Sequence, residues 1–163
     1  MAPNIDHSLD ADFINFGDLP EDVNELLQAG VAAYRRDKSK ADRLFRHALA
    51  TNPRLLPTYY CLYKIHTYQG NLDDALAFAE AGFNEAVRQV GLSGEYHDWS
   101  PPPIHIDDAA RFALYTLKAM AFIHLRRSEG TKARAILEEL ARLDPSGTVG
   151  WTVIADLAVQ AGK

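Results

Sequence analysis

Two histidines and three aspartates fall within a short stretch of the sequence, and these residue types could together hold a divalent metal ion. They are His97, Asp98, His105, Asp107 and Asp108, within twelve positions. The stretch has neither an HExxH motif nor two histidines four residues apart, the spacing at which a helix presents metal ligands. Asp107 and Asp108 are also explained as the first residues of a helix, where the helix dipole stabilises acidic side chains. We expect no metal or cofactor, and keep a metal-dependent enzyme using residues 91–108 as an alternative.

Signatures of other enzyme classes are missing from the sequence. Residues 91–94 read Gly-Leu-Ser-Gly, which lacks the G-x-S-x-G spacing of a nucleophile elbow. No glycine-rich motif for binding a phosphate or a dinucleotide is present. The single cysteine, Cys61, lies among aromatic and apolar residues, where a thiol is usually buried and inert. The sequence therefore indicates a protein without catalytic activity.

Composition and charge exclude several further functions. The chain has 163 residues, 47% of them hydrophobic and 24% charged, which is enough to form one folded domain. Its net charge is −5, and the first 25 residues contain seven acidic residues but no lysine or arginine. We expect no nucleic-acid partner, because such binding needs a concentrated basic surface. With one cysteine, no membrane-spanning apolar stretch and no secretory signal, a cytoplasmic protein is expected.

A pattern of small and apolar residues recurs three times along the chain. Each occurrence places these residues on one face of a helix, and a second apolar stripe precedes it, which predicts a pair of helices. The three sets are Ala41, Phe45, Ala48 and Pro53; Ala75, Ala79, Gly82 and Val87; and Ala133, Leu137, Leu140 and Pro145. The first two sets lie 34 residues apart and the last two lie 58 apart, so 24 residues are inserted between them.

This pattern resembles the tetratricopeptide repeat (TPR) family, whose 34-residue helix–turn–helix unit has small residues where its two helices touch. The third repeat has Ser128 at the turn position where glycine is usual. The second repeat matches the family pattern well, through Tyr59, Leu62, Gly70, Leu72, Ala75 and Ala79. The resemblance implies an all-α fold, a right-handed α–α superhelix of three helical hairpins followed by a C-terminal capping helix.

Helical periodicity and the positions of Gly, Pro and Asn divide the chain further. We expect an acidic, flexible N-terminal segment over residues 1–20 and one TPR-like domain over residues 21–163. The repeats span about residues 22–55, 56–90 and 107–145, with an insertion loop at 91–106 and the capping helix at 148–161. Helices are predicted near residues 21–36, 39–51, 54–69, 72–90, 107–127, 131–142 and 148–161. The buried side of the capping helix is predicted to be Trp151, Ile154, Leu157 and Ala158.

The insertion loop carries three consecutive prolines and a tryptophan, Trp99. The prolines favour an extended, stiff backbone. A loop of this length is usually functional or disordered. Because an exposed tryptophan loop is unfavourable, we expect it to pack over the helices.

In TPR proteins the first helix of each repeat lines a concave groove, and the resemblance assigns groove positions to this chain. They are Tyr34 and Arg35 (with Leu27 and Val31) in the first repeat, Tyr60, Lys64, Thr67 and Tyr68 in the second, and Tyr115, Lys118, Phe122, Leu125 and Arg126 in the third. These positions include aromatic and cationic side chains and no acid, so an acidic or acidic-hydrophobic peptide is the expected ligand. The alternative is that the aromatic residues belong to the core and the cations are merely solvated.

The expected function is that of a non-catalytic adaptor or scaffold that holds a peptide segment of another protein in this groove. A secretion-type TPR chaperone for an export client is an alternative, because such chaperones are similar in length and acidity. Leu27 and Val31 stand where chaperone-tail-binding TPR proteins have a lysine and an asparagine, so that kind of carboxylate binding is not expected. The partner and the oligomeric state stay open.

The N-terminal segment has the chemistry expected of a groove ligand. Residues 10–19 contain three aspartates together with Phe13, Ile14, Phe16 and Leu19. We hypothesise that this segment folds back onto the helices as an intramolecular competitor. The alternative is a mobile tail, as is common at chain termini.

Overall fold

In the computed structural model, residues 14–100 and 108–161 are described, and all regular secondary structure in these ranges is helical. The predicted all-α class is therefore confirmed for this part of the chain. The α-helices are α1 (Glu21–Tyr34), α2 (Lys38–Thr51), α3 (Leu56–Gln69), α4 (Leu72–Val90), α5 (Asp108–Arg126), α6 (Gly130–Leu143) and α7 (Trp151–Ala161). A short 3-10 helix, η1 (Tyr96–Asp98), lies between α4 and α5. Within these ranges, no helix combines the length and apolarity needed to cross a membrane.

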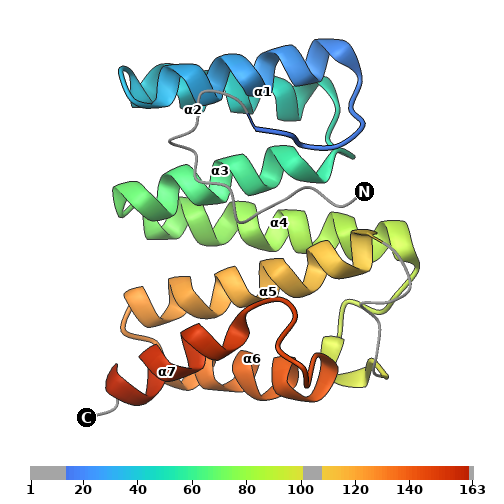
Figure 1. The fold of residues 1–163 in the computed structure, drawn as a ribbon, viewed down its shortest axis with the longest axis vertical. Helices are drawn as coiled ribbons and strands as arrows, with labels where there is room; N and C mark the ends of the chain where they lie inside the picture. The colour runs from blue at the N-terminus through green and yellow to red at the C-terminus, as the bar shows by residue number, and fades with distance from the viewer. Residues whose placement is uncertain (1–13, 101–107, 162–163) are drawn as a thin grey trace.

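The helices are arranged as successive pairs along the long axis of the molecule (Figure 1). Helix α1 packs on α2, α3 on α4, and α5 on α6. Each pair contacts the next one, through α2 and α3 and then through α4 and α5. Helix α7 packs on α5 and α6 at the end of the row. Helix α4 thus lies against both α3 and α5, the two helices that carry most of the predicted groove residues.

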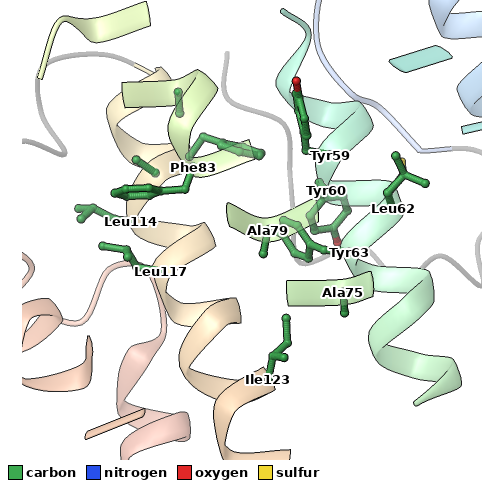
Figure 2. Packing of buried hydrophobic residues seen from close by; sticks show 14 of the residues in the cluster. Tyr59, Tyr60, Leu62, Tyr63, Ala75, Ala79, Phe83, Leu114, Leu117 and Ile123 are labelled. Atoms are coloured by element: carbon green, nitrogen blue, oxygen red, sulfur yellow. The ribbon is translucent and has the colours of Figure 1, made fainter. Parts of the chain in front are cut away.

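Glycines at the helix crossings let the two helices of a pair approach closely. A Cβ atom on Gly30 of α1 would lie 2.3 Å from Cε1 of Phe45 in α2, so only glycine fits there. A Cβ atom on Gly82 of α4 would lie 2.8 Å from Cβ of Tyr59 in α3. Figure 2 shows the core around α3, α4 and α5, in which Tyr60 and Tyr63 of α3 lie near Ala79 of α4, and Leu114 and Leu117 of α5 lie near Phe83. The small residues of the sequence pattern therefore lie at helix contacts.

The turns within the second and third pairs have the same backbone feature at equivalent positions. Helix α3 is followed by its C-cap, Gly70, which has a left-handed conformation with φ of 79°. After α5, Ser128 also has a positive φ, of 64°. Among the described residues, Ser128 is the only non-glycine residue with a positive φ. An L-residue there costs about 1–2 kcal/mol, so the backbone path of the turn is imposed by the packing of α5 on α6.

The described part of the insertion, residues 91–100, is anchored on α4 and α6. The Trp99 ring is 4% exposed and stacks on Phe83 of α4, with 5.8 Å between ring centres. Arg142 of α6 donates hydrogen bonds to the carbonyl oxygens of Tyr96, His97 and Trp99. The expected packing of Trp99 onto the helices is confirmed. Residues 101–106 of the predicted loop lie outside the described residues.

Helix α7 begins at Trp151, three residues later than the predicted start at 148. The backbone amides of Thr148 and Val149 donate to the two carboxylate oxygens of the buried Asp144, at 3.0 and 2.9 Å. Gly150 then has a positive φ, of 84°. These residues therefore form a turn, and helical geometry starts only after it.

The faces of α7 differ in part from the prediction. Ala158 is buried and Trp151 and Ile154 are partly buried against the core. Leu157 was expected to be buried, but it is 39% exposed. It lies four residues after Val153, which is 63% exposed, so both residues are on the outer face of the helix.

Replacing Gly30 with alanine tests whether the close contact between α1 and α2 outweighs the higher helix propensity of alanine. In an exposed helix interior this change stabilises a protein by about 1 kcal/mol. At Gly30 the new methyl group overlaps the Phe45 ring, so we expect Gly30→Ala to lower the free energy of unfolding by about 1–3 kcal/mol, measured by urea titration. In the control Gly94→Ala the added Cβ meets no heavy atom within 4 Å, and the change should stay within about 0.5 kcal/mol. A more stable Gly30→Ala protein would contradict the close approach of α1 and α2.

Candidate functional site

Seven of the predicted groove residues line one pocket between α3 and α5, with a volume of about 220 Å³. Helix α3 contributes Tyr60, Lys64, Thr67 and Tyr68, and helix α5 contributes Tyr115, Lys118 and Phe122. Their spacing of three or four residues places each set on one face of its helix. The two faces meet at the pocket because α4 packs against both helices.

Two lysines of this pocket lie near aromatic rings. The Nζ atom of Lys64 is 5.8 Å from the ring centre of Tyr60 and 5.4 Å from that of Tyr68. The Nζ atom of Lys118 is 5.0 Å from the ring centre of Tyr115. At such distances the negative face of a ring attracts an ammonium group. The pocket therefore combines an aromatic wall with two positive charges, one from each helix.

Four other predicted residues, Tyr34, Arg35, Leu125 and Arg126, are not among the described residues that line the pocket, and Leu125 is partly buried against the core. Tyr34 of α1 is buried, and its ring centre is 6.5 Å from that of Tyr68, so it continues the aromatic row toward α1. Arg126 of α5 donates a hydrogen bond to the carbonyl oxygen of Thr67 at 3.4 Å, which links the last turns of α5 and α3. Arg35 is exposed after the end of α1 and is not among the described residues that line the pocket.

Three lining residues were missed by reasoning from the sequence: Tyr63, Ala119 and Ile154. Tyr63 and Ala119 are the chain neighbours of Lys64 and Lys118, so widening each helix face by one position would have included them. Ile154 belongs to α7, whose contact with α5 lies outside the repeat pattern. Tyr63 is 3% exposed, and burial raises the pKa of its hydroxyl group, which therefore stays neutral.

In α1, Leu27 and Val31, which were expected at the groove, belong to the core. Leu27 is 0% and Val31 is 2% exposed.

The described end of the N-terminal segment packs on the same helix. The backbone N–H of Ile14 donates to the side-chain oxygen of Gln28 at 3.3 Å, and the Gln28 amide donates to the Ile14 carbonyl at 2.7 Å. Ile14 and Phe16 are almost fully buried, whereas residues 1–13, with Phe13, lie outside the described residues.

The charges on α3 and α5 are mostly positive. The two helices carry Lys64, Arg111, Lys118 and Arg126. Their one carboxylate, Asp108, is the first residue of α5 and lies 3.8 Å from Arg111. Because the middle of both helices carries positive charge only, the pocket favours a ligand that joins an anionic group to an apolar one.

The histidines at the equivalent repeat positions are buried near the hairpin turns. His66 is 5% exposed, stacks on Phe78 with 5.6 Å between ring centres, and places Nε2 2.7 Å from the Asp42 carboxylate. His124 is 7% exposed and places Nδ1 3.2 Å from the Glu129 carboxylate. Both histidines therefore pack inside the structure, each beside a carboxylate.

The residues considered as metal ligands are not gathered in the described part of the chain. His97 pairs with Glu139 of α6 at 3.2 Å, and Asp108 begins α5. His105 and Asp107 lie outside the described residues. Within residues 14–100 and 108–161, no group of three or more His, Cys, Asp or Glu side chains is placed to hold a metal ion.

Cys61 is fully buried in α3. Burial raises the pKa of its thiol above the ordinary value, so the thiol stays protonated. A protonated, inaccessible thiol is a poor nucleophile, which agrees with the inert packing role expected for this residue.

The fold and the site define this chain, over its described residues, as a row of helix pairs with an aromatic and cationic pocket between two of them. In comparisons with protein-family models, curated proteins and solved structures, nothing matched the chain.

The turn between α5 and α6 makes stability depend on pH. Hydrogen bonds with His124, Arg127 and Lys132 lower the pKa of Glu129 from its usual 4.5 to about 2. A carboxylate whose pKa is lowered by folding stabilises the fold above its unfolded-state pKa, and this contribution is lost as pH falls through the folded-state value. The free energy of unfolding should therefore fall more steeply between pH 4.5 and about pH 2 in the wild type than in Glu129→Gln.

Urea titrations at a series of pH values measure this difference. Glu80→Gln, which removes an exposed glutamate of α4, is the matched control and should retain the wild-type pH dependence. Identical pH profiles for Glu129→Gln and the wild type would contradict the proposed role of this carboxylate.

Proposed function

We propose that this protein is a TPR-like array, a right-handed superhelix of three hairpins closed by α7. It binds an acidic, apolar peptide segment of another protein in the pocket between α3 and α5. It acts by binding, as an adaptor or scaffold, and not by catalysis. The observation that carries the proposal is the placement of Lys64 and Lys118, from two neighbouring helices, beside aromatic rings of one pocket.

The equivalent positions of the second and third hairpins support the TPR-like assignment. Gly70 and Ser128 have positive φ values at corresponding turn positions, and His66 and His124 are both buried just before those turns. The helix contacts join each pair to the next one, as in arrays whose repeats contact only their neighbours.

The size of the pocket favours part of a peptide as the ligand. Its volume of about 220 Å³ lies below the range of about 300–1,000 Å³ that is typical of small-molecule sites. A side chain of an extended segment fits such a pocket, while the rest of the segment contacts the surrounding helix faces. Tyr68 is 50% exposed at the pocket and offers an apolar surface for this contact.

The aromatic wall reduces the entropy that binding costs. Tyr60 is 3% exposed, and its ring packs edge-on against Tyr63, with 5.6 Å between ring centres. Such buried rings lose little freedom when a ligand arrives. In the proposed complex an apolar side chain of the peptide covers the rings, and its carboxylates pair with Lys64 and Lys118. The apolar contact supplies most of the affinity, and the charges supply orientation and preference for acidic segments.

Reversing both charges tests the proposal. An array of synthetic peptides that combine acidic and apolar residues, each with a version in which Asn and Gln replace the acids, identifies a probe. We expect acidic probes to bind the wild type and to lose affinity by at least about tenfold in Lys64→Glu with Lys118→Glu, because attraction becomes repulsion. Fluorescence anisotropy measures the affinities, and the melting temperature should be unchanged.

Lys40→Glu with Arg43→Glu is the matched control, since both residues are exposed on α2, away from the pocket. It makes the same change in net charge and should leave the affinity within about twofold of the wild type. Equal losses in the two double variants would indicate a general effect of net charge. Probes that bind the pocket variant as tightly as the wild type would overturn the proposed site.

A further inference from the structure

We infer that residues 1–13 of this chain bind in the pocket between α3 and α5 and compete there with the external peptide. The inference rests on the proposed function, because it assigns a regulation to the same pocket. These thirteen residues lie outside the described part of the chain. The position at which the described chain begins, the path of residues 14–19 and the charge of residues 1–13 support it.

The chain is firmly attached at its first described residues. Ile14 is 2% and Phe16 is 3% exposed, and both backbone polar groups of Ile14 bond to the Gln28 side chain of α1. Residues 1–13 are therefore tethered to the helices at a fixed point. A tethered segment meets a nearby site at a local concentration of the order of millimolar, so even a weak ligand occupies it.

Residues 16–19 lie beside the first turns of α3 and α5, the two helices that form the pocket. Phe16 and Leu19 line a hollow together with Leu56 of α3 and Phe112 of α5. Lys64 follows Leu56 by eight residues, about two helical turns along the same face. The hollow beside residues 16–19 and the pocket therefore follow one another along α3 and α5.

The tether is long enough to reach the pocket. Gln28 and Tyr34 are six residues apart in α1, which corresponds to about 9 Å along the helix. From Tyr34 the pocket begins at Tyr68, with 6.5 Å between the two ring centres. Thirteen extended residues can span about 40 Å, so residues 1–13 are long enough to reach past Lys64 and Lys118.

The chemistry of residues 1–13 matches that of the proposed ligand. They include Asp6, Asp10 and Asp12 and no lysine or arginine. Ile5 and Phe13 supply apolar side chains beside these acids. Carboxylates can pair with the two lysines of the pocket while the apolar groups cover its aromatic wall. The same pocket therefore recognises its own chain terminus and an external segment by the same contacts.

A spin label on the full-length chain tests where residues 1–13 lie. Ser8→Cys provides a labelling site, and the fully buried Cys61 does not compete for the reagent. Compared with the reduced label, the nitroxide should strongly broaden the amide resonances of Lys64, Tyr68 and Lys118. Amides on α2, such as that of Ala50, serve as the internal reference and should keep their intensity. Pocket and reference resonances of equal intensity would overturn the inference.

Neutralising the three aspartates tests the competition. In Asp6→Asn with Asp10→Asn and Asp12→Asn, the broadening should decrease and the acidic probe peptide should bind about tenfold more tightly, because the tethered competitor is weakened. Glu80→Gln with Glu95→Gln and Glu138→Gln is the matched control, removing three exposed carboxylates of the described chain. Unchanged probe affinity in the aspartate variant, or an equal gain in the control, would overturn the inference.

The two proposals can fail separately in these measurements. Probe binding to the pocket without broadening from position 8 would leave the proposed function standing and reject its regulation. Broadening at the pocket in a protein that binds no acidic probe even after the three aspartates are neutralised would reject the proposed function, and with it the competition.

Discussion

The small side chains on the buried face of α4 are the constraint on which the pocket depends. Ala75, Ala79 and Ala86 are fully buried, and Gly82 lies against the backbone side of Tyr59. Because this face projects so little, α3 and α5 can both pack against α4 and come close to each other. Larger residues there would separate the two helices, and the aromatic and basic side chains that line the pocket would no longer meet.

The charges are segregated between these helices and the start of the chain. The middle parts of α3 and α5 carry basic residues only, whereas the acids of the first 25 residues have no lysine or arginine among them. Such segregation contributes little to the stability of the fold, because exposed ion pairs are weak. It instead favours contacts between the basic pocket and acidic segments, whether these come from another protein or from the same chain.

Much of the fold and of the pocket could be predicted because the information is local. The spacing of Ala75 and Ala79 marks one helix face, and that of Tyr60 and Lys64 marks another, whatever the rest of the chain does. Ile154 could not be predicted, since its place in the pocket depends on how α7 meets α5. The late start of α7 depends likewise on the buried carboxylate of Asp144, which binds two backbone amides.

The sequence by itself determined the all-helical class, the pairing of helices and most of the residues on the pocket-forming faces, because periodicity acts within a single helix. Only the tertiary structure decided which of these faces are covered. Leu27 and Val31 were expected to line the groove, yet α1 buries them in the core. Ile14 and Phe16, from the acidic terminal segment, are buried as well. Burial is a property of contacts between distant segments, and no spacing within one segment specifies it.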